Sequence, residues 1–94
     1  QVNIGREDQK SGIGVNELET FYNYCLDLNL NVIGLMCIPP FDHNPEEYFS
    51  EMQSLNEKLN LPELSMGMSS DYLKAIEFSS TFVRIGSSIF GKRD

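Results

Sequence analysis

The sequence has little positive charge and no long apolar run. Seven lysines and arginines stand against 14 acidic residues, for a net charge of −7. The basic stripe that binding to nucleic acids or anionic membranes requires is therefore missing. No apolar run approaches the roughly 20 residues that span a bilayer, and no signal-peptide pattern is present. We expect no nucleic acid and no membrane as partner, and one domain of 94 residues around a modest core.

Cysteine and histidine are also scarce. The two cysteines, Cys25 and Cys37, have no metal-ligand spacing and stand among apolar residues. This predicts buried, reduced thiols in a cytoplasmic protein, with a disulfide between them as the alternative. The single histidine, His43, lies in a loop and has no cysteine or second histidine as a metal partner. We interpret it as a solvated bystander, so the sequence predicts no metal site.

Short apolar strands alternate with amphipathic helices along the chain. This order predicts right-handed βαβ units and a parallel sheet, either a small open α/β sheet or a sector of a (β/α)₈ barrel. A whole barrel takes about 250 residues, and a strand that starts at Gln1 without a lead-in favours the sector. The expected strands are 1–4, 32–38, 64–66 and 82–85; the expected helices are 15–28, 44–60 and 71–78, with a polar loop at 5–14 and a final helical turn at 86–90.

The helix starts have recognisable signals. Asn44 can accept a hydrogen bond from the first turn, Pro45 suits the first helical position, and Glu47 completes a pair that resembles a capping box. Ser69 or Ser70 is expected to cap the helix at 71–78.

Two glycine- and serine-rich turns follow the last two strands. They are Leu64-Ser-Met-Gly-Met-Ser-Ser-Asp71 and Phe82-Val-Arg-Ile-Gly-Ser-Ser-Ile-Phe-Gly91. If the strands are parallel neighbours, the turns lie side by side at one end of the sheet. Glycine allows close approach of the backbone, and serine hydroxyls and helix N–H groups donate to anions. The pattern predicts a phosphate cradle.

These two segments resemble the closing segments of the pyridoxal phosphate homeostasis proteins, single-domain relatives of the barrel domain of alanine racemase. Gln1-Val-Asn-Ile4 with Lys10-Ser-Gly-Ile13, and Gly34-Leu-Met36 with Ile38-Pro39, resemble the same family in the same order, so the resemblance spans 1–94. It implies a single incomplete domain, the C-terminal sector (about strands 5 to 8) of a (β/α)₈ TIM barrel of the alanine racemase type. It also implies pyridoxal phosphate as the cofactor, bound at the carboxyl ends of the strands.

The resemblance implies roles for five residues. Ser65 holds the phosphate with help from the turn around Ser69, and Gly86 and Ser87 form the other part of the phosphate site. Arg84 faces the pyridine nitrogen. Because a guanidinium does not readily give up a proton, Arg84 should keep that nitrogen unprotonated and weaken the cofactor as an electron sink. This suits a carrier or a restricted racemase better than an enzyme of general carbanion chemistry. The resemblance favours the first, a non-catalytic protein of intracellular pyridoxal phosphate homeostasis.

The sequence departs from the family pattern at several positions. The Schiff-base lysine of the family belongs to a first-strand segment that these residues lack, and neither Lys10 nor Lys92 matches it. Ser87 replaces a threonine and keeps its hydroxyl. Ser79 replaces the usual glycine after the last helix, at a cost of about 1 kcal/mol if that position is left-handed.

The sequence thus predicts half a site, with contacts to the phosphate and the ring nitrogen but no lysine to bind the cofactor covalently, and no catalytic residue. Other interpretations of these residues stay open. Without the resemblance, Arg84 is a surface arginine that ends a strand, and Ser65 and Ser69 are ordinary turn and cap residues. A fragment of an alanine-racemase-like enzyme, or a small α/β module that binds another phosphorylated ligand, are the alternative functions.

A barrel sector leaves sheet edges and the apolar strand 32–38 uncovered, and such surfaces promote association. We predict that the 94-residue chain alone is not a well-behaved monomer, and that either the N-terminal part of the barrel or other copies of the chain cover the exposed surface. Light scattering checks this, and a monodisperse monomer that melts cooperatively would contradict it.

Overall fold

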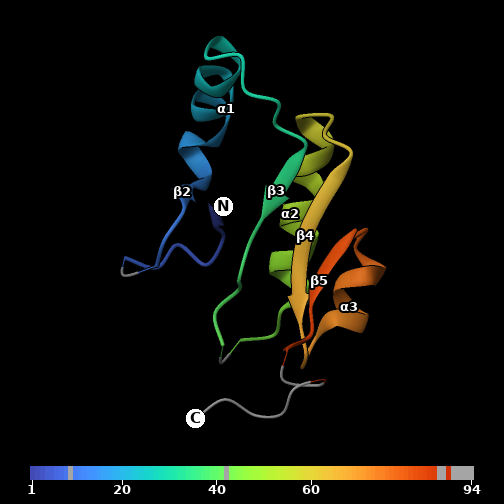
Figure 1. Cartoon of the computed structure of the whole chain (residues 1–94). Coiled ribbons are helices and arrows are strands. Elements are labelled where there is room, and N and C mark those ends of the chain that lie inside the picture. Colours follow the sequence, from blue (N-terminus) through green and yellow to red (C-terminus); the bar gives the residue numbers. More distant parts are fainter. Residues whose placement is uncertain (9, 42, 87–88, 90–94) are drawn as a thin grey trace.

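The computed structural model describes residues 1–8, 10–41, 43–86 and 89, and shows short parallel strands connected by helices (Figure 1). The elements are, in chain order, β1 (Val2–Asn3), β2 (Ile13–Gly14), the 3₁₀ turn η1 (Val15–Glu17), α1 (Leu18–Asp27), β3 (Gly34–Met36), α2 (Glu46–Lys58), β4 (Glu63–Met68), α3 (Tyr72–Glu77) and β5 (Phe82–Arg84). The predicted alternation of strands and helices is confirmed from β3 onward. The predicted turn at 86–90 falls mostly outside the described residues.

The strands form two sheets rather than one. β3, β4 and β5 pair in that order and in parallel, and β1 pairs in parallel with β2. The prediction of a polar loop over 5–14 was therefore wrong for its last two residues, which form β2. The loop is closed by Asn3, whose side-chain amide donates to the Glu7 carbonyl at 2.7 Å and accepts from the Glu7 N–H at 3.2 Å. A strand of only two residues among glycines left no periodic signal in the sequence.

One face of the three-stranded sheet carries the core. Alternate side chains of β3 and β4, such as Leu35 and Met66, point to α2 and α3, where Phe49 and Ala75 are buried. The cluster continues to β1 and to the start of α1; its buried members are Val2, Ile4, Leu18, Leu35, Cys37, Phe49, Met52, Leu64, Met66 and Ala75. The opposite face of the sheet is therefore left for side chains such as that of Ser65.

The first helix forms as predicted, but most of its apolar stripe is not buried. Leu18 is 5% exposed, whereas Phe21 is 48% and Leu28 53% exposed. α1 lies to one side of the three-stranded sheet (Figure 1), and its main contacts are with η1 and β2. None of the described helices is long and apolar enough to cross a membrane.

The two later helices begin differently. The Glu46 N–H donates to Asn44 Oδ1 at 3.0 Å, as predicted. The expected capping pair of Asn44 and Glu47 was wrong, because Pro45 is the N-cap rather than the first helical residue and no side chain caps it. The predicted serine cap of α3 was wrong, because Asp71 occupies the N-cap position. The Asp71 carboxylate accepts from the Met68 N–H at 2.7 Å, which closes the turn before α3.

Ser79 has a left-handed backbone, with φ of 71°. The condition under which we expected a cost at this position is therefore met. Its hydroxyl accepts a hydrogen bond from Gln53 Nε2 at 2.8 Å at an exposed position. We predict that Ser79→Gly is more stable than Ser79→Ala by about 1 kcal/mol, since both lose the hydroxyl but only glycine adopts positive φ without cost. Urea unfolding at one chain concentration measures the difference, and equal stabilities would contradict the assignment of strain to this residue.

Candidate functional site

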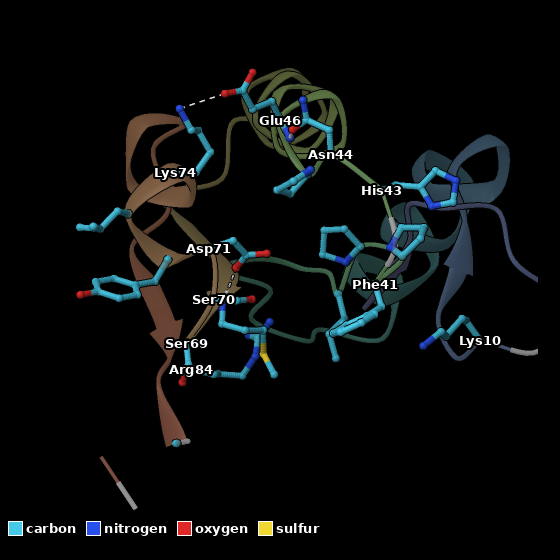
Figure 2. Close-up of a pocket in the computed structure, with 18 residues that line it drawn as sticks. Lys10, Phe41, His43, Asn44, Glu46, Ser69, Ser70, Asp71, Lys74 and Arg84 are labelled. Atoms are coloured by element: carbon cyan, nitrogen blue, oxygen red, sulfur yellow. Dashed lines mark hydrogen bonds and ion pairs between the residues drawn. The ribbon is translucent and has the colours of Figure 1, made fainter. Parts of the chain in front are cut away.

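A cavity of about 1330 Å³ opens at the carboxyl ends of β3, β4 and β5 (Figure 2). This is the end of a parallel sheet at which ligands bind in α/β proteins. Its lining comes from the segments that follow β3 and β4, from β5 and from the first loop; the residues are Lys10, Ile38, Pro39, Pro40, Phe41, His43, Asn44, Pro45, Glu46, Met68, Ser69, Ser70, Asp71, Tyr72, Leu73, Lys74, Arg84 and Gly86.

Arg84 is the most tightly fixed polar side chain of this cavity. Its Nη1 donates to Ser65 Oγ at 2.5 Å, and its Nη2 donates to the Cys37 carbonyl oxygen at 2.9 Å. Residues of β4 and of the chain just after β3 therefore hold a side chain that starts on β5. The Arg84 Nε–H is buried and has no acceptor among the described residues. A buried donor without a partner costs about 1–3 kcal/mol, so an acceptor atom on a ligand would relieve this cost.

The structure brings together three of the five predicted site residues. Ser69, Arg84 and Gly86 line the cavity. A Cβ added at Gly86 would meet no described atom within 4 Å, so a ligand has room to approach this backbone. Ser65 does not line the cavity and instead contacts Arg84. Ser87 lies outside the described residues.

A bulge in β4 positions the end of that strand. The pairing of β4 with β5 shifts register between Ser65, which pairs with Phe82, and Met68, which pairs with Arg84. Gly67 occupies the shift with φ of 106°, and a Cβ there would approach the Ala75 Cβ at 2.8 Å. Only glycine fits this backbone next to α3. Because one residue is inserted, Met68 no longer lies on the face that buries Met66, and it lines the cavity.

The rim of the cavity carries an ion pair between two helices. Lys74 Nζ of α3 lies 2.9 Å from Glu46 Oε1 of α2 and 3.0 Å from Glu77 Oε2. Hydrogen bonds to these two carboxylates raise the pKa of Lys74. The lysine therefore stays protonated, while Arg84 lies deeper and has no carboxylate among its described hydrogen-bond partners.

Sequence reasoning missed several residues of the cavity. His43, interpreted as a solvated bystander, lines it, and its ring meets Tyr48 edge-on with centroids 6.4 Å apart. Asp71 also lines it. Their position in the sequence could have identified them, since both residues follow strands and therefore lie at the end of the sheet where the cavity opens. No group of three or more potential metal ligands occurs in the described part of the chain.

Comparison with known proteins identifies the family. Residues 1–94 match the family described as alanine racemase, N-terminal domain. The chain belongs to this family. A pyridoxal phosphate homeostasis protein of Aquifex aeolicus is 44% identical over 103 residues, which cover 99% of this chain and 45% of that protein.

Further members of the family bear the same name. The pyridoxal phosphate homeostasis protein of Pasteurella multocida is 46% identical over 105 residues, covering 100% of this chain and 45% of its own length. The human protein of this name is 43% identical over 110 residues, covering 100% of this chain and 39% of its own. The chain thus spans less than half the length of these curated relatives. The family and the α/β class predicted from the sequence are confirmed, while the C-terminal placement within the barrel stays a prediction.

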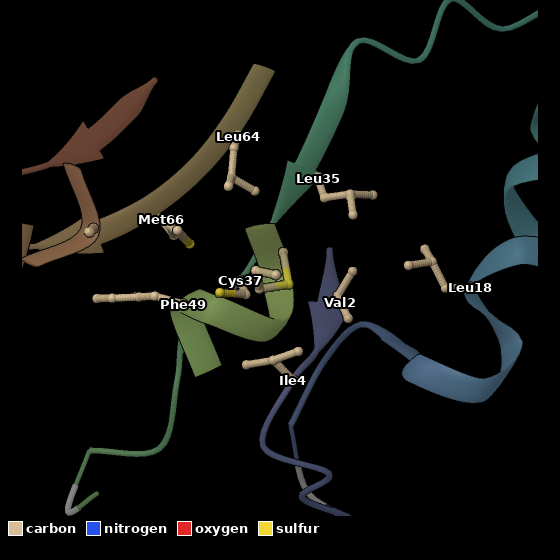
Figure 3. Close-up of a cluster of buried hydrophobic side chains, with 10 residues drawn as sticks. Val2, Ile4, Leu18, Leu35, Cys37, Phe49, Leu64 and Met66 are labelled. Atoms are coloured by element: carbon tan, nitrogen blue, oxygen red, sulfur yellow. The ribbon is translucent and has the colours of Figure 1, made fainter. Parts of the chain in front are cut away.

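The two cysteines differ in environment. Both are free; Cys37 is fully buried in the core (Figure 3), whereas Cys25 is only half-buried. Burial is the main cause that raises the pKa of the Cys37 thiol from 9.0 to about 12, and the nearby Arg84 opposes this only in part. The prediction of two buried thiols is confirmed for Cys37 alone.

We predict that a thiol reagent modifies Cys25 in the folded protein and modifies Cys37 only after unfolding. Because the Cys37 pKa is raised in the folded state, its neutral thiol favours folding below pH 9.0, and this contribution is lost as the pH rises toward about 12. Mass spectrometry of labelled peptides at pH 7 and pH 9 measures the reactivity, with Cys25→Ser as control. Rapid labelling of Cys37 in that folded variant would contradict the prediction.

Proposed function

We propose that this chain carries the phosphate- and pyridine-nitrogen-binding side of a pyridoxal phosphate site, in a protein of intracellular pyridoxal phosphate homeostasis. One observation carries the proposal: the Arg84 guanidinium is fixed at the cavity by two acceptors, and its buried Nε–H has no acceptor among the described residues. The names of the relatives support the same cofactor.

The pyridine nitrogen is the acceptor that suits Arg84 Nε. A guanidinium stays protonated at any physiological pH, so the nitrogen opposite it keeps its lone pair free to accept the hydrogen bond. Bound pyridoxal phosphate supplies an electron-withdrawing ring and an aldehyde, and an unprotonated ring withdraws electrons less strongly. Arg84 thereby disfavours general carbanion chemistry and suits a carrier or a restricted racemase.

The phosphate group belongs at the turns beyond the strands. Ser69 lines the cavity after β4, and Gly86 lines it after β5, where the backbone is open to a ligand. In the proposed site both turns, with Ser87, donate hydrogen bonds to the phosphate oxygens. We assign no lysine of this chain a covalent role, although Lys10 lines the cavity.

The decisive experiment is to measure pyridoxal phosphate binding by equilibrium dialysis for the wild type and two arginine variants. Arg84→Gln should weaken binding roughly 10- to 100-fold, since a hydrogen bond from a charged group contributes about 1.5–3 kcal/mol. Arg6→Gln is the matched control, because Arg6 is exposed and pairs with Glu51 at 2.7 Å away from the cavity lining. Its affinity should be unchanged. A folded Arg84→Gln protein with wild-type affinity would contradict the proposal.

Competition separates the alternative functions. Pyridoxal without phosphate and inorganic phosphate should each compete weakly, because each occupies one part of the site. If phosphate competes but pyridoxal does not bind, the cavity is a cradle for another phosphorylated ligand. If the loaded protein racemises alanine, the enzyme alternative holds.

A further inference from the structure

The position of Ser65 does not suit a residue that binds the phosphate group. Its Oγ lies 2.5 Å from Arg84 Nη1, and the residue does not line the cavity. We propose that Ser65 is a positioning residue, which fixes the Arg84 guanidinium so that its Nε–H points at the ring nitrogen. The inference rests on the proposed function, and it replaces the phosphate contact that family resemblance implies for Ser65.

Two acceptors fix the plane of the guanidinium where one would not. The Cys37 carbonyl accepts from Nη2 at 2.9 Å, and with this bond alone the planar group could still rotate about it. The second bond, from Nη1 to Ser65 Oγ, removes that freedom. The direction of the remaining Nε–H is then set by the sheet. Because the carbonyl belongs to the backbone, Ser65 is the only one of the two described acceptors whose group a substitution removes.

The strand register places Ser65 far from the phosphate turn. Arg84 pairs with Met68, yet its guanidinium reaches Ser65, three positions earlier on β4. The side chain therefore runs back along the sheet instead of out into the turn. Ser69 lies beyond the end of β4 and lines the cavity, whereas Ser65 lies within the strand and does not line it. Ser65 and Ser69 therefore serve different parts of the ligand.

Two side chains just before β5 bind the backbone of β4. Ser80 Oγ donates to the Met66 carbonyl at 2.6 Å, and Thr81 Oγ1 accepts from the Leu64 N–H at 2.8 Å. These side-chain bonds hold β5 against β4 on both sides of Ser65, in the region where the ladder shifts register. The Ser65 hydroxyl takes no part in these bonds and accepts from Arg84 Nη1.

A measurement without cofactor tests the positioning itself. In ¹⁵N NMR, the Arg84 Nε–H of the wild type should exchange slowly with water, because it is buried. Ser65→Ala should speed this exchange at least about tenfold, and Ser65→Thr, which keeps the hydroxyl, should restore it. Ser54→Ala, at an exposed position of α2 outside the cavity lining, is the control and should leave the Arg84 signal unchanged. Unchanged exchange in folded Ser65→Ala would overturn the inference.

Binding of two probes then tests the role in the site. Ser65→Ala should weaken pyridoxal phosphate binding roughly threefold to tenfold and change inorganic phosphate binding by less than about twofold, whereas Ser69→Ala should weaken both. In the Arg84→Gln background, Ser65→Ala should have no further effect, because the two residues act as a unit. Equal weakening of both probes by Ser65→Ala, additive with Arg84→Gln, would show that Ser65 is a phosphate ligand and overturn the inference.

The two experiments distinguish failure of the inference from failure of the proposed function. If the wild type binds no pyridoxal phosphate, the proposed function fails, and the exchange rate of Arg84 still decides whether Ser65 holds the guanidinium. If the wild type binds the cofactor and Arg84→Gln weakens it while Ser65→Ala does not, the proposed function stands and the inference fails.

Discussion

The candidate site depends on one half-buried cation that joins three parallel strands. Arg84 starts on β5, donates to Ser65 of β4 and donates to the Cys37 carbonyl just beyond β3. A charged group can be removed from water in this way only when hydrogen bonds compensate its lost hydration. The described residues compensate Nη1 and Nη2 but leave Nε without an acceptor. In the proposed site, this Nε–H is the donor that remains for a ligand.

The strand–helix alternation and the location of the cavity could be predicted from the sequence because both follow from local patterns. The all-apolar run around Leu35 and the stripe of α2 are short-range signals of a parallel sheet and its covering helix. The glycine-rich turns also marked Ser69 and Gly86, which line the cavity. Local pattern and three-dimensional structure agree most closely between β3 and β5.

Other features could not be predicted because they depend on contacts between distant residues. The two-residue strand β2 exists because the Asn3 side chain closes the preceding loop. Asp71, not a serine, is the N-cap of α3, and its carboxylate accepts a hydrogen bond from the Met68 N–H. The contact of Ser65 with Arg84 joins residues 19 positions apart on neighbouring strands, β4 and β5. In the sequence Ser65 and Ser69 belong to one motif. In the structure Ser65 contacts Arg84, whereas Ser69 lines the cavity.

Cys37 belongs to two environments at once. Its thiol is packed in the core near Phe49 and Met52, while its carbonyl oxygen accepts from Arg84 at 2.9 Å. A change in core volume on the helix-covered side of the sheet would shift this carbonyl, since close-packed interiors transmit strain. In the proposed site, conservative replacements of Phe49 would therefore change the absorption spectrum of the bound cofactor, although Phe49 does not contact it. The spectrum would then report how well the interior is packed.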